Sequence, residues 1–265
     1  MKADSPLTKA AIEAAVEAGK LLLSGFGTSY TISSKEGNQN LVTEYDFQSQ
    51  KLIISLLQKK FPDHQFLGEE DQEKQILNPS KITWIIDPLD GTVNFARSIP
   101  IFSTSIAAAL GTEILTGVVY YPSMNELFVA EKNRGAYLNG KQIRVSQRDR
   151  LDRALMATGF PYDVDKNPLN CIETFSTIVR KGTPIRRLGS AAIDLSYVAA
   201  GRFDTFWEVG LHAWDLAAGK LLVEEAGGKV SHYDGSEHRL YGYFPALATN
   251  GHLHQNMVDI LNAFN

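Results

Sequence analysis

The chain has 265 residues, of which 44% are hydrophobic and 21% charged, and its formal net charge is −4. This length suffices for one large domain or two closely joined halves, and the weakly acidic balance gives no electrostatic reason to expect nucleic-acid or membrane binding. Cys171 is the only cysteine, which excludes an internal disulfide and favours a reducing compartment. No apolar run approaches the roughly 18 residues of a membrane span. We therefore expect a cytoplasmic protein.

Two helices are predicted near the start of the chain. Ser5 as N-cap and Pro6 at the first helical position open the first helix, whose apolar residues recur at three- and four-residue steps. A polar, glycine-containing loop is predicted at residues 35–40, and Thr43 caps the second helix. Asp46 lies in its first turn, where an acid is commonly only a favourable partner of the helix dipole. The apolar residues predicted to share one face of this helix are Phe47, Ile54, Leu57 and Phe61.

A strand over residues 82–86 precedes two acids, Asp87 and Asp90. Its bulky, β-branched and aromatic residues are typical of a strand that is buried on both faces. Pro88 has a fixed φ and no N–H, which predicts that the strand ends there, and Gly91 permits a conformation or close approach that a Cβ would prevent. Two acids at the end of a buried strand are costly unless something positive lies between them. Taken alone, the pair also fits an Asx turn that faces water.

The middle of the chain has the pattern of an antiparallel meander. Strands are predicted at residues 103–110, 114–121 and 126–131, followed by a hairpin over residues 137–143. Asn139 and Gly140 supply the tight turn of that hairpin.

The C-terminal half has a different pattern, in which strands alternate with helices. Strands are predicted at residues 154–158, 184–188 and 203–208, and helices at residues 170–181, 190–200 and 213–226. Alternation of this kind favours a parallel or mixed sheet covered by helices. We expect an α/β fold, a layered α+β sandwich, with an antiparallel sheet in an N-terminal subdomain at residues 1–146 and a mixed sheet in a C-terminal subdomain at residues 147–265.

Acidic residues stand at the ends of three predicted elements. Glu69 and Glu70 end a short strand, Asp87 and Asp90 follow the buried strand, and Asp215 enters the first turn of a helix. Sheet-based folds gather their sites at such element ends. Carboxylates with a backbone carbonyl are hard oxygen ligands that suit magnesium or manganese. One carboxylate that bridges two ions roughly 4 Å apart is the arrangement used for phosphoryl transfer to water.

Other chemistries fit the sequence less well. His64 and His212 lie near the acids and could add a nitrogen ligand, but lone histidines are more often packing residues, and the sequence has no H-x-x-x-H pair. Phosphatases with an aspartyl nucleophile use D-x-D-x-T, whereas two residues separate Asp87 from Asp90. Ser190 follows a glycine but lacks the G-x-S-x-G pattern, and the sequence contains no D-x-D-x-D-G calcium loop. A non-catalytic binding module that retains the fold is the remaining alternative.

Taken together, these motifs resemble the inositol monophosphatase family, within the lithium-sensitive, magnesium-dependent phosphatases. The resemblance covers essentially the whole chain, and every expected ligand is present. The segments that carry it are residues 68–70, residues 84–92 followed by Asn94 and Phe95, residues 188–192, Glu208 and residues 214–219.

The resemblance implies a phosphomonoesterase that holds two to three Mg²⁺ ions, with Mn²⁺ as a substitute. Asp87 would bridge two metals. Glu69 and the Leu89 carbonyl would complete the first site, and Asp90 with Asp215 would hold the second. A third, weaker metal would depend on Glu69 and water.

The resemblance also implies roles in catalysis and substrate binding. Glu69 and Thr92 would orient the attacking water, and the N–H groups of Gly91 and Thr92 would receive phosphate oxygens. The alcohol half of the substrate would contact Gly189, Ser190, Ala191 and Glu208. The substrate-binding residues that the resemblance implies also include Glu69, Leu89, Asp90, Gly91, Thr92 and Asp215. Supporting positions near the metals are implied for Lys35, Asp46 and Glu70.

The substrate is less well defined than the chemistry. Relatives with these motifs cleave inositol monophosphates, fructose 1,6-bisphosphate, NADP or 3′-phosphonucleotides. Glu208 would accept hydrogen bonds from a polyol and repel a second phosphate, so an inositol monophosphate is expected. Arg186 and Arg187 could serve a bisphosphate, although arginines on a strand beside solvent are commonly surface residues. The family further implies a homodimer that acts on a small phosphorylated metabolite.

Overall fold

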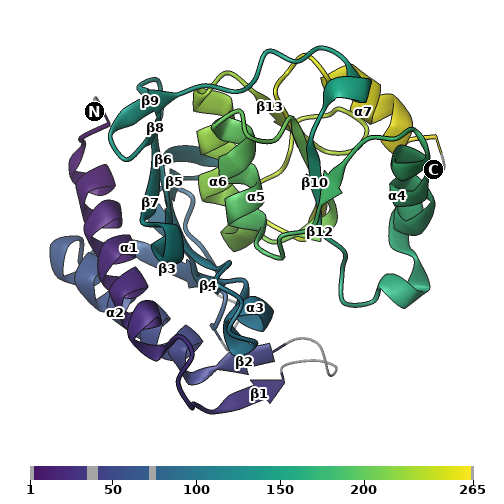
Figure 1. The fold of residues 1–265 in the computed structure, drawn as a ribbon. Coiled ribbons are helices and arrows are strands. Elements are labelled where there is room, and N and C mark those ends of the chain that lie inside the picture. The colour runs from purple at the N-terminus through teal and green to yellow at the C-terminus, as the bar shows by residue number, and fades with distance from the viewer. Residues whose placement is uncertain (1–2, 35–40, 72–75, 264–265) are drawn as a thin grey trace.

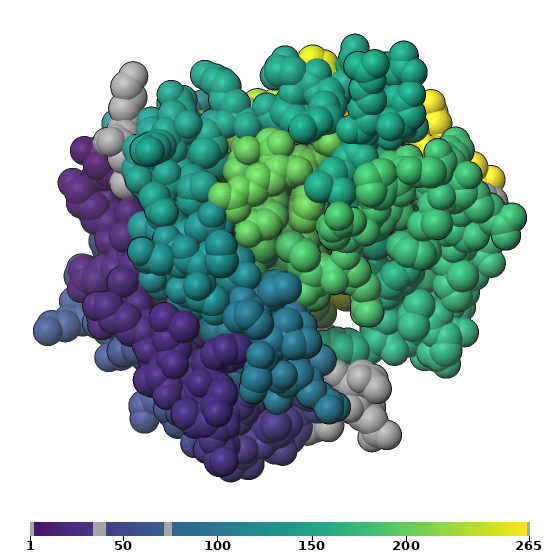
Figure 2. All heavy atoms as spheres, viewed as in Figure 1, coloured from purple at the N-terminus to yellow at the C-terminus, as the bar shows by residue number. Residues whose placement is uncertain are grey.

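The computed structural model describes residues 3–34, 41–71 and 76–263. Helices and sheets alternate in layers (Figure 1), which confirms the predicted layered α/β fold. The first helical layer consists of α1 (Pro6–Gly25) and α2 (Glu44–Lys60), the central one of α5 (Ala191–Ala199) and α6 (Ala213–Glu225), and the last of α4 (Cys171–Arg180) and α7 (His254–Leu261). In the space-filling view, teal atoms of the N-terminal half pack directly against green atoms of residues that follow in the chain (Figure 2). Within the described ranges, no helix has both the length and the apolar character needed to cross a membrane.

The caps of the first two helices form as the sequence predicts. The Ser5 hydroxyl accepts a hydrogen bond from the Thr8 N–H at 3.2 Å, and Thr43 and Asp46 form a reciprocal capping box at the start of α2. The predicted apolar face of α2 is partly wrong, because Phe47 is 47% exposed. The buried face carries the polar residues Asp46, Ser49 and Gln50 beside the apolar residues Ile53 and Leu57.

A seven-stranded sheet in the order β3-β4-β5-β6-β7-β8-β9 dominates the N-terminal half. Its strands are β3 (Gln65–Gly68), β4 (Ile82–Asp90), β5 (Ser103–Leu110), β6 (Glu113–Tyr121), β7 (Glu126–Glu131), β8 (Gly135–Leu138) and β9 (Lys141–Ile143). The meander from β4 to β9 is antiparallel as predicted, and Asn139 and Gly140 adopt the positive φ of a tight turn. A purely antiparallel sheet is wrong, because β3 pairs in parallel with β4. The long connection between these two strands permits a parallel arrangement that a tight turn would not.

The prediction that the strand ends at Pro88 is also wrong, because β4 continues to Asp90. Its pairing with β5 shifts between Asp87 and Asp90, so the missing N–H of Pro88 falls where the ladder is irregular. The Pro88 carbonyl accepts hydrogen bonds from the hydroxyls of Ser49 and Thr104 at 2.9 and 3.2 Å. Side chains therefore hold the backbone at the point where the two acids emerge.

The C-terminal half contains a five-stranded sheet in the order β11-β10-β12-β14-β13. Its strands are β10 (Met156–Thr158), β11 (Ile185–Arg186), β12 (Thr205–Leu211), β13 (Lys229–Ser231) and β14 (Phe244–Thr249). Because β10 is parallel to both neighbours and β14 antiparallel to both of its own, the predicted mixed sheet is confirmed. The strands β13 and β14 and the helix α7 were not predicted.

Smaller elements complete the described chain. The strands β1 (Ile32–Ser34) and β2 (Leu41–Thr43) form an antiparallel pair, and α3 (Thr92–Ala96) is a short helix after β4. Short 3₁₀ helices lie at Pro122–Met124, Leu151–Arg153, Val164–Lys166 and Pro168–Asn170.

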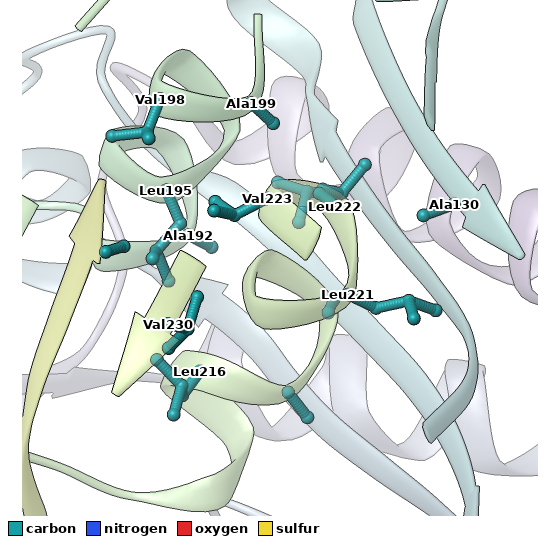
Figure 3. Packing of buried hydrophobic residues seen from close by; sticks show 14 of the residues in the cluster. Ala130, Ala192, Leu195, Val198, Ala199, Leu216, Leu221, Leu222, Val223 and Val230 are labelled. Atoms are coloured by element: carbon teal, nitrogen blue, oxygen red, sulfur yellow. The ribbon is translucent and has the colours of Figure 1, made fainter. Parts of the chain in front are cut away.

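The largest core cluster joins the two sheets through α5 and α6. It contains Ile85 and Phe128 from the first sheet, Phe206 from the second, and buried residues of both helices. Figure 3 shows Leu195 and Val198 of one helix beside Leu222 and Val223 of the other. The proposed boundary after residue 146 falls between the sheets, but the shared core packs the two halves together, and their independence as subdomains stays a prediction.

Candidate active site

The seven-stranded sheet places three acids together at the end of β4. Asp87 and Asp90 are buried on β4, with exposed fractions of 2% and 9%. Glu69 directly follows the neighbouring strand β3, and its N–H donates to the Ile86 carbonyl at 3.0 Å. The parallel pairing of β3 with β4 therefore brings Glu69 beside Asp87, a contact that the order of the acids in the sequence does not show.

Helix α6 brings a fourth acid, Asp215, to the same place. Ser105, which is paired across the sheet with Asp87, donates from its hydroxyl to the Trp214 carbonyl at 3.3 Å. Burial first, and then the charges of the other three acids, raise the pKa of Asp87 well above its ordinary value. A side-chain hydrogen bond with Glu69 raises it further. The structure thus brings together the four predicted side-chain ligands.

Hydrogen bonds orient these carboxylates. The Leu89 N–H donates to Oδ1 of Asp87 at 3.1 Å, and the His212 N–H donates to Oδ2 of Asp215 at 2.7 Å. Burial, followed by the charge of Glu69, raises the pKa of Asp215 well above its ordinary value. These hydrogen bonds therefore fix the orientation of the Asp87 and Asp215 carboxylates, although the neighbouring negative charges disfavour their ionised forms.

Asp90 is held by the N-terminus of α5. Its Oδ2 accepts hydrogen bonds from the Ser190 hydroxyl at 2.5 Å and the Ala192 N–H at 2.8 Å, and its Oδ1 accepts one from the Ala191 N–H at 3.3 Å. Burial raises the pKa of Asp90 to about 6, although these donors act in the opposite direction. Ser190 and Ala191, predicted to face the substrate, thus contact an acid of the cluster.

The donor set fits a hard divalent cation, because every side chain in the cluster offers carboxylate oxygen. In the described part of the chain, no group of three or more His, Cys, Asp or Glu side chains already lies in an arrangement that could hold one ion. A cation would therefore have to draw the carboxylates closer, and its charge would offset their mutual repulsion.

Asp46 orients Thr92 beside this cluster. The Thr92 hydroxyl lies 2.9 Å from Oδ1 of Asp46 and 3.0 Å from the Leu89 carbonyl. Oδ2 of Asp46 accepts hydrogen bonds from the N–H and the hydroxyl of Thr43, so the helix cap also fixes this carboxylate. Burial raises the pKa of Asp46 to about 6. Lys35, predicted to support the same region, lies outside the described residues.

Two glycine-containing segments meet next to Thr92. Gly91 has a φ of 96°, and a Cβ there would lie 2.9 Å from the Ile101 carbonyl, so only glycine fits. The Asn94 amide donates to the carbonyls of Ile101 and Leu188, both at 2.8 Å. Asn94 therefore ties the segment before Gly189 to the start of α3.

Glu208 lies on β12, in the five-stranded sheet of the C-terminal half. Burial raises its pKa to about 8, the charge of Asp90 raises it as well, and the charge of Arg187 lowers it. The Arg187 guanidinium lies over the Phe160 ring, 5.4 Å from its centroid. The charge of Arg187 thus acts on Glu208, which the sequence did not indicate. Both Arg186 and Arg187 are exposed, as expected of surface arginines.

The remaining candidates are two histidines that pack against aromatic rings, and Glu70. His64 accepts a hydrogen bond from the Trp84 indole at 3.1 Å and stacks on Phe61, as expected of a lone histidine. His212 stacks on Trp214 with ring centroids 4.5 Å apart. Glu70 is buried, and its N–H donates to the side chain of Gln50 at 3.0 Å.

Comparison with known proteins places this arrangement in context. Residues 3–263 match the model of the inositol monophosphatase family. The inositol-1-monophosphatase of Caulobacter vibrioides is 40% identical, over 95% of this chain and 99% of that protein. The chain belongs to the inositol monophosphatase family. The Nus factor SuhB of Escherichia coli K12 is 41% identical, over 87% of this chain and 86% of that protein.

Solved structures of other family members agree with this assignment. The suhB protein of Bartonella henselae has a TM-score of 0.90 at 37% identity, covering 98% of this chain and 99% of that one. An IMPase/NADP phosphatase in complex with Mg²⁺ and phosphate has a TM-score of 0.81 at 25% identity, covering 94% and 92%. Because these family members carry different names, membership supports phosphatase chemistry and leaves the substrate open.

The structure also reveals a buried acid near Glu208 that sequence reasoning missed. Asp194 is 2% exposed, and none of the described residues donates a hydrogen bond to its Oδ1. Burial raises its pKa well above the ordinary value, and the charge of Glu208 contributes. The signal in the sequence was an acid within the otherwise uncharged helix at residues 191–199.

Proposed function

We propose that the chain is a magnesium-dependent phosphomonoesterase that hydrolyses an inositol monophosphate by attack of a metal-activated water. The observation that carries this proposal is the convergence of Glu69, Asp87, Asp90 and Asp215. After burial, the charges of the neighbouring acids raise the pKa of Asp87 and of Asp215. Such a cluster is costly by itself and becomes favourable with cations. The IMPase/NADP phosphatase relative, whose structure contains Mg²⁺ and phosphate, supports the choice of metal.

The metal ligands follow from this arrangement. Asp87 would bridge two Mg²⁺ ions, with Glu69 and the Leu89 carbonyl on one and Asp90 and Asp215 on the other. Bound Mg²⁺ would lower the pKa of a coordinated water and offset the charge that develops on the phosphate. Mn²⁺ would serve as a substitute because it accepts the same oxygen ligands.

The remaining residues of the site would position the reacting groups. Thr92, fixed by Asp46, would orient the attacking water together with Glu69. The backbone N–H groups of Gly91 and Thr92 would bind phosphate oxygens. Gly189, Ser190, Ala191 and Glu208 would line the space for the alcohol, where Glu208 accepts hydrogen bonds from its hydroxyl groups.

A substrate panel tests this function. We would measure phosphate release from inositol 1-phosphate, fructose 1,6-bisphosphate, NADP and a 3′-phosphonucleotide in the presence of Mg²⁺. The highest kcat/KM is expected for inositol 1-phosphate, with inhibition by lithium, which would replace a weakly held Mg²⁺. Full activity in excess chelator would contradict the metal-dependent mechanism. Loss of activity on every ester would instead favour a non-catalytic member of the family.

The assembly and location of the protein are separate proposals. We infer a cytoplasmic homodimer from the family resemblance and from the composition of the chain. Light scattering of the purified protein should give twice the 29.3 kDa mass of the chain. A monomer mass across the working concentration range would contradict the homodimer.

A further inference from the structure

The carboxyl group of Glu208 lies against a glycine of the neighbouring strand. Strands β10 and β12 are parallel, with Thr158 opposite Trp207, and the Thr158 hydroxyl donates to the Trp207 carbonyl at 2.8 Å. This register brings Gly159 alongside Glu208. A Cβ built on Gly159 would overlap both carboxyl oxygens and the carboxyl carbon of Glu208.

The backbone of Gly159 does not itself require glycine. Gly159 does not have the positive φ found at Gly91 and Gly189, so an L-residue could adopt its conformation. What a side chain would meet is the end of Glu208. The space over Gly159 is therefore explained by the carboxyl group that occupies it.

The next residue acts on the same carboxyl group from another direction. The Arg187 guanidinium lies over the Phe160 ring, and its charge acts on Glu208. The segment after β10 thus provides both the space for the carboxyl and a ring that supports Arg187, whose charge acts on that carboxyl. A change confined to Gly159 would alter the first feature and leave the second in place.

We propose, on the basis of the proposed function of this site, that Gly159 determines specificity by positioning Glu208. The missing side chain at Gly159 lets the Glu208 carboxyl lie where the hydroxyl groups of a polyol reach it. Gly159 is a positioning residue, since it acts through Glu208 and has no role in the chemistry at phosphorus.

The test replaces Gly159 with alanine and compares two substrates. Inositol 1-phosphate carries hydroxyl groups on its alcohol half, whereas phenyl phosphate carries none. Because the overlap involves the end of a flexible side chain, Gly159→Ala should move the carboxyl and keep the fold. The kcat/KM for inositol 1-phosphate should fall roughly tenfold, mainly through KM, which corresponds to the loss of one hydrogen bond. The value for phenyl phosphate should stay within about twofold.

A double-mutant cycle shows whether the effect passes through Glu208. In the Glu208→Ala background the overlap is absent, so adding Gly159→Ala should have no further effect on either substrate. Gly19→Ala is the matched control, because its Cβ would overlap the Tyr120 ring, which belongs to the core between α1 and the seven-stranded sheet. This control should keep the substrate preference of the wild type.

Several outcomes would overturn the role of Gly159. These are equal losses on both substrates, the same loss in the Glu208→Ala background, or a Gly159→Ala protein that fails to fold while the double variant folds. A wild type without preference for inositol 1-phosphate over phenyl phosphate would instead overturn the proposed function as well. If Glu208→Ala removes the preference and Gly159→Ala retains it, only the role of Gly159 fails.

Discussion

Buried carboxylates at two places in this protein differ in what surrounds them. We call Glu131 with its donors the Glu131 group, and the acids at the end of β4 the Asp87 group. Glu131, at the end of β7, accepts hydrogen bonds at Oε2 from the Ser5 N–H at 3.0 Å and the Thr8 hydroxyl at 2.7 Å. Arg134 lies 3.0 Å from its other oxygen. Burial alone would raise the pKa of Glu131, but these donors outweigh it and hold the pKa below its ordinary value.

The acids at the end of β4 are in the opposite situation. The charges that act on Asp87 come from other carboxylates, and its pKa lies well above the ordinary value. The comparison teaches that burial of an acid does not by itself mark a functional site. The Glu131 group stabilises the fold with protein donors, whereas the Asp87 group has the properties of a cation site.

The largest expected effect is the loss of turnover in Asp90→Asn. This change keeps the size of the side chain but removes one negative charge and one ligand from the proposed second metal site. We expect kcat with inositol 1-phosphate to fall by more than about a hundredfold, measured as phosphate release at saturating Mg²⁺. Asp63→Asn, at an exposed position, should leave kcat unchanged. Near-normal turnover of Asp90→Asn would remove Asp90 from the site.

Next in size is the effect of Glu131→Gln on stability. The substitution removes the charge that the Ser5 and Thr8 donors stabilise, so the free energy of unfolding should fall by about 2 kcal/mol in urea denaturation. Turnover of the folded protein should not change, because Glu131 belongs to the group that is satisfied by protein donors. An unchanged urea midpoint, or a loss of turnover, would contradict the distinction between the two groups.

Lowering the pH should reduce the difference in stability between the wild type and Glu131→Gln. The folded-state pKa of Glu131 is lowered, so its stabilising contribution is complete above the ordinary value of 4.5 and is lost as the pH falls through the folded-state value. Wild type should therefore lose more stability than Glu131→Gln between about pH 6 and about pH 3, by on the order of 1 kcal/mol. Urea denaturation across this range checks the sign, and a gap that widens with acid would contradict it.

The smallest effect is expected for Arg134→Ala. The Arg134 side chain is 53% exposed, so its ion pair with Glu131 is screened by water. Its loss should lower the free energy of unfolding by about 0.5 kcal/mol or less. A loss as large as that of Glu131→Gln would show that the ion pair, rather than the Ser5 and Thr8 donors, stabilises this group.

Local features of the fold were predictable from the sequence. The Ser5 and Thr43 caps and the Asn139-Gly140 turn depend on neighbouring residues, and each was correct. The layered fold and the mixed C-terminal sheet also followed from the order of the patterns. The acids of the site could be named because they stand at element ends, although their convergence depends on the pairing of β3 with β4.

The errors arose where distant parts of the chain decide the local structure. The strand passes Pro88 because Ser49 and Thr104 hold its carbonyl, and neither is a sequence neighbour. Phe47 is exposed because the buried face of α2 carries polar residues that contact the β4 end and Asp71. Gly159 resembled any other glycine until its register with Glu208 was known.

Magnesium-dependent unfolding tests the central distinction most directly. We would measure the free energy of unfolding of wild type, Glu131→Gln and Asp90→Asn with and without Mg²⁺ at about a hundred times its Kd. Wild type and Glu131→Gln should each gain roughly 2.7 kcal/mol for one site. Asp90→Asn should gain much less, because it lacks one of the proposed ligands. An equal gain in all three proteins, or none in the wild type, would contradict a cation site at the end of β4.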